Sequence, residues 1–490
     1  MSTPDFFRAR LDQMIDLRHP LVVLATRMPW AQLEAAVAPC FARQDRPGER
    51  LEGIDLFGPT VAVAGAGVSA AGRPRLPLRL MLSLLYLKHA FDLSDEELVQ
   101  RWSENVVWQY FSGLEYYEPR LPCDATQIGR FRRALGEAGV EEVLKATIEA
   151  AVQMKAVRPA EFERVIVDTT VQEKAIAHPV DSRLLEIARH QVVKAAKAAG
   201  IPLKQTFAKE GRTLRRKAGG YAHAKQFRRL RKVVKRQRTI LGKVLREIAR
   251  KRGEATDARA RARLDTLVSR AERIRTQQPK DKGKLYALHA PEVECIGKGK
   301  ARRPYEFGVK VGVVVTARQG LMVGARTFPG NPYDGHLLAE QLEQTTVLLE
   351  DVGVQPKEVY ADLGFRGVDA ANPNVEIVHR GKLKSLTKSQ RRWLKRRQAV
   401  EPAIGHAKND HRMDRCWLQG ATGDALHAVL CAAGYNLRWL LRAIARLGLQ
   451  PVFLRLLLGW LRDAPGARRR RQVGHGAPLR EWLTTLPALG

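Results

Sequence analysis

Two short apolar segments, each ending in an aspartate, constrain the fold of this chain more than any other feature. The first, Phe162–Asp168, is rich in β-branched residues, and the second, Lys357–Asp362, is followed by Gly364 and Gly367. Short apolar runs of this kind are typical of buried strands. We therefore expect two strands, each with an acidic side chain at its carboxyl end.

Further elements are predicted between and after these two segments. They are a hairpin of strands 305–317 and 321–328 that turns at 318–320, a helix over 335–350, a strand at 375–378 and a helix around Glu401. An order of strand, hairpin, helix, strand, strand and helix is typical of a mixed β-sheet with helices packed on it. The fold class expected is multidomain α/β, with this mixed-sheet core between residues 156 and 450.

Length and charge indicate what such a chain binds. Its 490 residues exceed one ordinary domain, so two or three domains are expected. Lys and Arg total 84 against 51 Asp and Glu, which gives a formal net charge of +33 and an isoelectric point near 10.4. A polyanion is the expected partner, and nucleic acid, the ribosome and an anionic membrane surface all qualify.

The sequence predicts neither a membrane span nor an export signal. The most apolar run, Leu76–Phe91, carries Arg79 and Lys88 and falls short of the roughly 18 uninterrupted apolar residues that a span needs. Met1–Arg10 has charged residues and no apolar stretch. The five cysteines are scattered, without a Cys-x-x-Cys pair or the Cys/His spacing of a zinc finger. We expect a cytoplasmic, nucleoid-associated protein without disulfides.

The first 155 residues predict a helical DNA-binding domain, with a helix-turn-helix-like unit near residues 94–136. Ser94 and Glu97 form the pattern of a capping box at the start of one helix, and Asp124 is placed to cap a second. Recognition helices need exposed basic side chains, although an ordinary solvated helix face is the alternative. The arginines that fall largely off the apolar face of the second helix, and that we expect to contact DNA, are Arg130, Arg132 and Arg133.

Residues 183–284 interrupt the predicted core with a segment of different character. Basic residues far outnumber acidic ones from Lys204 to Lys282, and apolar residues recur there at helical spacing in two sets. The pattern predicts a helical hairpin, for which a coiled coil is one arrangement. Because like charges repel unless a polyanion neutralises them, we expect this insert to contact DNA. Residues 451–490 are expected to form a C-terminal helix and a basic tail that includes Arg468–Arg471.

Three acidic residues have positions suited to holding metal ions for phosphodiester transfer. Such chemistry needs hard oxygen ligands from separate elements that share the same ions. Asp168 and Asp362 meet this requirement if their strands lie side by side, and Glu401 is the third candidate. Asp334 competes with Asp362 for the second position, but it lies at a predicted helix start, where a role as N-terminal cap accounts for it.

Cationic residues flank Glu401 on its predicted helix. At helical spacing Arg397, Glu401, Gly405 and Lys408 fall on one face. Such a face presents a carboxylate between two cations, with a glycine where a phosphate backbone can approach closely. Pro402 makes the shared face provisional, because a proline inside a helix kinks or breaks it. An exposed ion pair between Arg397 and Glu401 is the alternative, since pairs at this spacing are common.

Several motifs in a fixed order resemble those of one protein family. They are Thr126–Arg132, Val165–Thr170, His289–Lys300, Tyr305–Lys310, Asn331–Gly335, Ala361–Gly367 and Val400–Lys408. Together they resemble the transposases of bacterial insertion sequences in the RNase H-like acidic-triad (DDE) superfamily, and most closely the insertion sequence 5 family. Arg397, Glu401 and Lys408 match the spacing of a Tyr-x2-Arg-x3-Glu-x6-Lys signature, but Leu394 stands in place of its tyrosine.

The resemblance implies a DNA transposase with an RNase H-like catalytic core. Asp168, Asp362 and Glu401 would hold two Mg2+ ions, for which Mn2+ can substitute, while Arg397 and Lys408 would grip the scissile backbone. The N-terminal domain would bind terminal inverted repeats as double-stranded DNA, and a homodimer or higher oligomer would join the ends to target DNA. Cleavage by activated water would precede strand transfer by the liberated 3′ hydroxyl.

Two other functions fit the same residues. One is an RNase H-like nuclease that cuts DNA without rejoining it, against which the basic insert and the N-terminal block count. The other is a catalytically inactive DNA-binding protein descended from a transposase, against which the presence of all three acids counts. Terminal repeats in the DNA that flanks the gene would distinguish a transposase from both.

Overall fold

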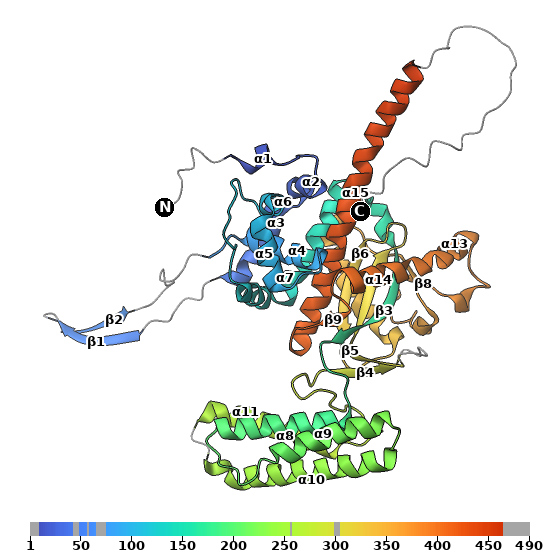
Figure 1. Cartoon of the computed structure of the whole chain (residues 1–490). Coiled ribbons are helices and arrows are strands. Elements are labelled where there is room, and N and C mark those ends of the chain that lie inside the picture. The colour runs from blue at the N-terminus through green and yellow to red at the C-terminus, as the bar shows by residue number, and fades with distance from the viewer. Residues whose placement is uncertain are drawn as a thin grey trace. The chain divides into compact units, whose positions relative to one another are not determined.

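The computed structural model describes residues 9–42, 49–55, 58–64, 75–254, 257–297 and 304–463 (Figure 1). Contacts divide the chain into a unit Met1–Arg442 and a unit Ala443–Gly490. Helix α15 (Gly420–Asp463) continues into the second unit, and the basic tail expected after it lies outside the described residues. No helix in the described part of the chain is long and apolar enough to cross a membrane.

Most of the described elements before residue 155 are helices. They are α1 (Leu11–Met14), α2 (Pro20–Arg27), α3 (Trp30–Val37), α4 (Leu78–Ala90), α5 (Asp95–Glu104), α6 (Val106–Phe111) and α7 (Ala125–Gln153). The capping box of Ser94 and Glu97 is confirmed. The Asp124 cap is also confirmed, since its carboxylate accepts a hydrogen bond from the Thr126 backbone N–H at 2.8 Å. Helix α7 is interrupted at Gly136, where φ is 66°, so the predicted recognition helix ends there.

Strands β1 (Glu49–Asp55) and β2 (Gly58–Ala64) form an antiparallel pair that was not expected. The prediction of a helical domain over residues 1–155 is therefore wrong for these two segments. The sequence does carry a strand signal, because β-branched residues alternate with alanine at the end of β2. Such residues favour extended backbone, where their stiff side chains are accommodated without strain.

The central sheet is mixed, as expected. Its strands are β3 (Arg164–Lys174), β4 (Glu294–Gly297), β5 (Tyr305–Thr316), β6 (Met322–Phe328), β7 (Glu358–Tyr360), β8 (Glu376–Val378) and β9 (Arg415–Cys416). Strand β3 pairs antiparallel with β5 and parallel with β7. Strand β5 also pairs antiparallel with β4 and β6, while β7 pairs parallel with β8. The predicted hairpin, here β5 and β6, and the mixed α/β class are confirmed (Figure 1).

Helices pack against this sheet and are tied to it by a buried amide. Helix α12 (Leu338–Leu348) packs on β6 and β5, and α14 (Val400–Asp410) packs beside β3. In α15, the Asn436 side chain accepts a hydrogen bond from the Met322 backbone N–H at 2.9 Å and donates one to the Met322 carbonyl at 2.8 Å. Asn436 also donates to Thr147 of α7 at 3.0 Å, so one side chain joins α7, α15 and β6.

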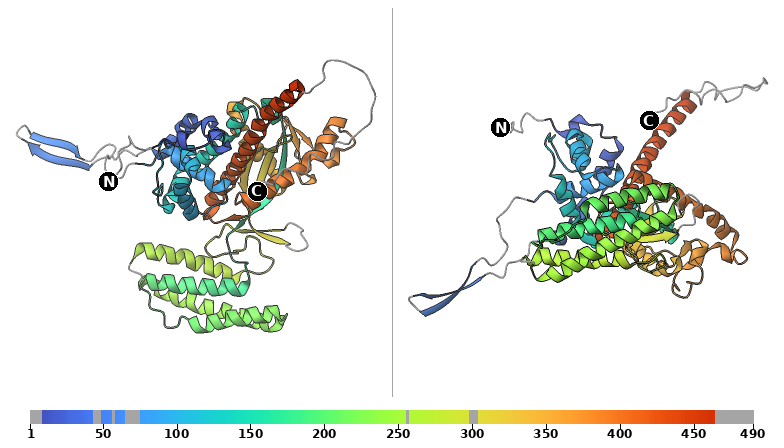
Figure 2. Two further views of the ribbon diagram at one scale, coloured as in Figure 1. Left: turned by 45° about the horizontal axis from the view of Figure 1, so that its top comes forward. Right: turned by 60° about the horizontal axis from the view of Figure 1, so that its bottom comes forward.

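The basic insert is a helical bundle and not the expected hairpin. Helices α8 (Asp181–Ala198), α9 (Ala208–His223), α10 (Phe227–Lys251) and α11 (Ala258–Thr276) lie side by side in both views of Figure 2. The predicted pair corresponds to α10 and α11, but α8 contacts α9, α10 and α11. Leu185 of α8, Leu241 of α10 and Leu264 of α11 belong to one hydrophobic cluster. The prediction failed because the apolar face of α8 lies before the basic segment from which the hairpin was inferred.

Both ends of the insert start from the same part of the sheet. Glu173 of β3 and Glu294 of β4 both lie opposite Gly308 of β5. Neighbouring strands are about 4.8 Å apart, so the two strands that flank β5 are about 10 Å apart at this level. The insert therefore leaves and rejoins the sheet without changing the strand order.

Helix α15 approaches α4 so closely that residue 434 must be glycine. A Cβ atom on Gly434 would lie 2.5 Å from the carbonyl carbon of His89. We expect Gly434→Ala to lower the free energy of unfolding by about 1–3 kcal/mol, because an added methyl group forces the two backbones apart. Gly219→Ala in α9 is the matched control, since a Cβ there meets nothing within 4 Å. Urea denaturation compares them, and a Gly434→Ala variant as stable as the control would refute the expectation.

Candidate active site

The parallel pairing of β3 with β7 brings two of the predicted acids to the same level of the sheet. Ile166 lies opposite Tyr360 in the last pair that these strands form. Asp168 and Asp362 each follow two residues later, so the register places them at neighbouring positions on the same face. The condition set by the sequence, that their strands lie side by side, is confirmed.

Asp168 lies within β3 and not at its carboxyl end, which corrects the expectation. The strand continues to Lys174 because its residues after Asp168 keep pairing with β5, from Thr169 opposite Gly312 onwards. Strand β7, in contrast, stops at Tyr360. Asp168 therefore lies at the level where the chain leaves the sheet after β7.

The donors to the Asp168 carboxylate include a backbone N–H and an arginine. Its Oδ1 accepts a hydrogen bond from the Thr169 backbone N–H at 2.7 Å, and its Oδ2 accepts one from Nη1 of Arg397 at 3.3 Å. The Asp168 side chain is 21% exposed and the Arg397 side chain 12% exposed. Arg397 begins the short 3-10 turn η9 (Arg397–Ala399), directly before α14. This ion pair thus attaches the segment that carries Glu401 to the strand that carries Asp168.

Glu401 is exposed at the second position of α14. Pro402 follows it in the first helical turn, where a proline displaces no intrahelical hydrogen bond, so the helix continues to Asp410. Helical spacing then places Glu401, Gly405 and Lys408 on one face. Arg397 lies outside α14, in η9, and it pairs with Asp168 rather than with Glu401.

The expectation that Asp334 caps a helix is wrong. Tyr333 occupies the cap position of the 3-10 turn η5 (Asp334–Leu337). Asp334 Oδ1 instead lies 2.9 Å from Nζ of Lys310 and accepts a hydrogen bond from Oγ1 of Thr169 at 3.3 Å. Because Lys310 is buried, this pair compensates a charge that would otherwise be costly.

The loop after β7 lies beside Asp334. Asp362 occupies the cap position of the 3-10 turn η7 (Leu363–Phe365), where its carboxylate accepts a hydrogen bond from the Leu363 backbone N–H. A Cβ atom on Gly364 would lie 3.2 Å from Oδ2 of Asp334. Asp334 is therefore close enough to the predicted site to remain the alternative second acid.

The three predicted acids supply suitable ligands, but their ligand atoms are not gathered around one point. Among the residues that the structure describes, the group with three ligand atoms within 4.8 Å of one another is a different one, His89, His427 and Cys431. The carboxylate oxygens of Asp168 and Asp362 accept hydrogen bonds from Arg397 and from backbone N–H groups. As a donor set, carboxylates from a strand, a loop and a helix match the preference of Mg2+ for hard oxygen ligands.

The sequence interpretation missed a basic helix next to η9. Helix α13 (Lys388–Arg396) begins with a capping box formed by Thr387 and Gln390. Leu394, which replaces the signature tyrosine, is buried and therefore packs instead of facing a substrate. The signal available was the density of Lys and Arg around Trp393 and Leu394. The exposed cations of α13 include Lys388, Arg391, Arg392 and Lys395.

Arg130 and Arg133 are exposed on the first segment of α7, but Arg132 is not. Arg132 is 6% exposed, and its Nη2 lies 3.8 Å from Oδ2 of Asp95, which Lys88 also contacts. Burial lowers the pKa of Arg132. The predicted exposure of Arg132 is wrong because α5 covers this side of α7. We therefore drop Arg132 from the set proposed to contact DNA.

Arg132→Ala and Arg133→Ala are expected to have different effects. Arg132→Ala should lower the free energy of unfolding by about 2 kcal/mol, because it leaves a cavity and removes a cation from Asp95. Arg133→Ala should leave stability within about 0.5 kcal/mol of the wild type and weaken DNA binding by removing an exposed cation. Urea denaturation and gel mobility shifts measure the two effects. Equal losses of stability would contradict the assignment.

Comparison with known proteins identifies the class of protein to which this chain belongs. Residues 49–134 match a family model described as "Transposase domain (DUF772)", and residues 271–437 match one described as "Transposase DDE domain". A Rhizobium meliloti protein named "Uncharacterized protein ORF8 in nfe locus" is 44% identical over 223 residues, which make up 46% of this chain and 95% of that protein. No solved structure matches the chain. The chain belongs to the DDE transposase family.

The family defines a class of activity and covers part of the candidate site. A DDE transposase acts on DNA, in transposition and recombination, as a metal-dependent nuclease. Asp362 and Glu401 lie within residues 271–437, and Arg130 and Arg133 lie within residues 49–134. Asp168 lies outside both matched regions, so its assignment depends on the register of β3 and β7.

Proposed function

We propose that the chain is an insertion-sequence transposase, akin to the insertion sequence 5 family, with an RNase H-like core that cuts at terminal inverted repeats and joins the ends to target DNA. The register of β3 and β7 carries this proposal, because it sets Asp168 and Asp362 at neighbouring positions. The contact between Arg397 and Asp168 supports it, since it brings the segment of Glu401 to the same strand.

Asp168, Asp362 and Glu401 are the residues that would hold Mg2+ or Mn2+. Their donor atoms are carboxylate oxygens, which these hard ions prefer, and the register and the Arg397 contact bring their elements together. Bound ions would lower the pKa of the attacking water or 3′ hydroxyl and stabilise the leaving oxygen. The site therefore needs no side chain as nucleophile.

Cations of the chain itself would position the scissile strand. Arg397 lies beside Asp168 and can exchange this carboxylate for a phosphate of bound DNA. Lys408 shares a helix face with Glu401, and Gly405 between them leaves room for a backbone to approach. The exposed basic side chains of α13 would extend this surface along the DNA.

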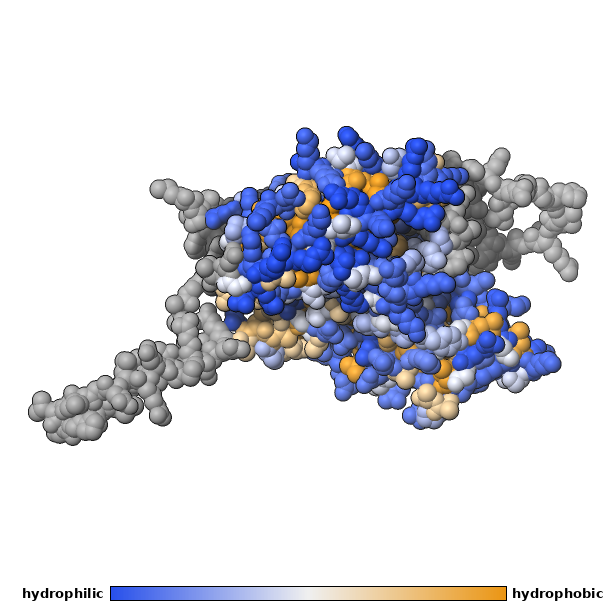
Figure 3. Space-filling view, turned by 90° about the horizontal axis from the view of Figure 1, so that it is seen from below, coloured by the Kyte–Doolittle hydropathy of each residue, from blue (hydrophilic) through white to orange (hydrophobic). Residues whose placement is uncertain are grey.

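Recognition and general affinity would come from different parts of the chain. Arg130 and Arg133, in the segment that follows the Asp124 cap, would contact the terminal repeats. The insert presents a largely hydrophilic surface, seen from below in Figure 3, with basic side chains along α9 and α10. Such a surface would bind the phosphates of DNA whatever its base sequence, and so raise the general affinity for DNA.

The experiment that tests this function uses the full chain, Mg2+, linear DNA that carries the repeats flanking the gene, and a target plasmid. A transposase should cut at the repeat ends and give products in which these ends are joined to the plasmid. Cutting at the ends without joined products would favour the nuclease. Binding without cutting would favour an inactive DNA-binding descendant.

A further inference from the structure

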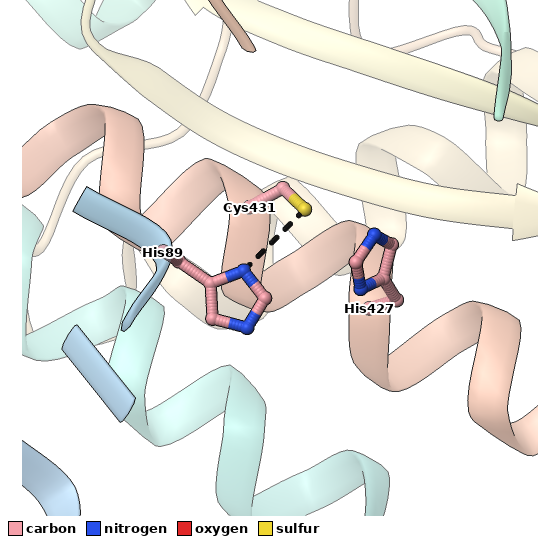
Figure 4. A group of neighbouring side chains, drawn as sticks. All are labelled: His89, His427 and Cys431. Carbon is pink, nitrogen blue, oxygen red and sulfur yellow. Dashed lines mark hydrogen bonds between the residues drawn. The ribbon is translucent and has the colours of Figure 1, made fainter. Parts of the chain in front are cut away.

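A buried group of metal-binding side chains lies outside the candidate active site. His89 near the end of α4, and His427 and Cys431 of α15, each place one ligand atom within 4.8 Å of the others (Figure 4). The residues are 1%, 4% and 0% exposed, respectively. His427 and Cys431 are four residues apart, so both occupy one face of α15. Segments more than 300 positions apart in the sequence thus meet at one buried point.

We propose that His89, His427 and Cys431 bind a zinc ion that fastens α4 to α15. The Cys431 Sγ lies 3.6 Å from Nδ1 of His89. On a tetrahedral zinc ion, with Zn–N of about 2.05 Å and Zn–S of about 2.3 Å, a nitrogen and a sulfur ligand lie about 3.6 Å apart. The observed separation is therefore that of neighbouring ligands on zinc. Three protein ligands leave the fourth position to water or to another group.

The hydrogen bond of His427 agrees with a ligand role. Nε2 of His427 lies 2.8 Å from the Arg412 carbonyl oxygen, so Nε2 carries the proton and Nδ1 keeps its lone pair. Zinc-binding histidines typically donate their other ring N–H to an acceptor of this kind. In His89 the ring nitrogen that faces Cys431 is Nδ1, so Nδ1 is the ligand atom of this ring. Nε2 of His89 then carries the proton and, within the described residues, is buried without a hydrogen-bond partner, which the ion does not explain.

The chemistry of the ligand atoms favours a soft metal ion. Two imidazole nitrogens and one cysteine sulfur lie together in this group (Figure 4). Imidazole and thiolate together select zinc over the Mg2+ that carboxylates prefer.

The cations near this group are compensated by carboxylates, so they repel a bound metal ion only weakly. The cations around this group have carboxylate partners, since Lys88 and Arg132 contact Asp95 and Arg412 contacts Asp92. Their repulsion of a zinc ion is thereby reduced, and the Cys431 thiolate compensates one of its two charges. The alternative is a dry contact in which the Cys431 thiol donates to His89, without metal.

The site would join the two regions that match transposase models. His89 lies within residues 49–134, and His427 and Cys431 lie within residues 271–437. The backbones already touch here, because Gly434 packs on His89. A zinc ion would therefore stabilise the contact between α4 and α15 and have no part in the chemistry at the acids.

Metal analysis of the tag-free full chain, washed with a mild chelator, tests this proposal. We expect about one zinc per chain, falling below about 0.1 in Cys431→Ala and in His427→Ala. Cys295→Ala and Asp168→Asn are matched controls and should keep their zinc, because they remove a cysteine and an acid outside the group. Zinc retained by Cys431→Ala, or lost equally from the controls, would overturn the proposal.

Cobalt binding gives a second test, which uses only the wild-type protein. Wild-type protein loaded with Co2+ should show a thiolate-to-cobalt charge-transfer band, because Cys431 would be a ligand. A folded wild-type protein that binds neither zinc nor cobalt with this band would show that the group is a dry contact between neutral side chains.

Discussion

Asp168→Asn, Asp362→Asn and Glu401→Gln are each expected to lower Mg2+-dependent cleavage of end-bearing DNA by at least about a thousand-fold. The amides keep the size of the side chains but remove the negative charge that holds the ions. Metal ions supply several kcal/mol of transition-state stabilisation, and about 4 kcal/mol corresponds to a thousand-fold in rate. DNA binding should persist in all three variants, as gel mobility shifts would show.

Asp334→Asn separates the two candidates for the second acid. Asp334 pairs with buried Lys310 and accepts a hydrogen bond from Thr169, so its loss should reduce stability more than cleavage by the folded protein. We expect its cleavage rate to stay within about tenfold of the wild type. Robust cleavage by Asp362→Asn together with an inactive, folded Asp334→Asn would move the second ligand to Asp334.

Removing residues 179–285 and closing the gap with a short Gly/Ser linker is expected to give a folded protein with weaker, less salt-sensitive DNA binding. A short linker can close the gap, because His178 and Tyr286 both lie against the Phe307 ring, with centroid distances of 5.4 and 5.3 Å. The hydrophobic cluster of the bundle is removed almost whole. Cutting only Lys204–Lys282 should instead unfold the protein or make it aggregate, because α8 would keep its apolar face without α10 and α11.

Charge variants test DNA binding by the insert while the insert itself stays in place. Replacing four exposed cations of α10 by glutamine should flatten the slope of log affinity against log salt by about 0.9 for each DNA phosphate that the insert no longer neutralises. Exchanging arginine and lysine at the same four positions keeps the charge and is the control. An unaltered slope, or unfolding of the linker variant, would show that the bundle is a structural brace. The four cations are Arg228, Arg229, Arg231 and Lys232.

The sequence predicted the core of the fold because its signals are local. The β-branched run before Asp168, the turn between β5 and β6, and the caps at Ser94 and Asp124 each depend on residues within a few positions. The sequence left open whether the strands that carry Asp168 and Asp362 lie side by side. The parallel pairing of β3 and β7 meets this condition, and it became visible only in the structure.

Features that depend on distant partners could not be predicted in this way. Arg132 has the helical position of a surface residue, but α5 and Asp95 cover it. Asp334 precedes a helix as a cap would, yet Lys310 on β5 holds its carboxylate. Motif spacing could not predict the group of His89, His427 and Cys431, because His89 lies in another part of the chain. In each case a partner remote in sequence decides the environment of the residue.

Mn2+ binding to the full chain on end-bearing DNA, counted by electron paramagnetic resonance, tests the central claim most directly. The claim predicts that Asp168→Asn, Asp362→Asn and Glu401→Gln each weaken Mn2+ binding by at least about tenfold, or roughly 1.4 kcal/mol. Asp334→Asn should leave this binding unchanged. Unaltered Mn2+ affinity in Asp168→Asn or Glu401→Gln would contradict a metal site built from these acids.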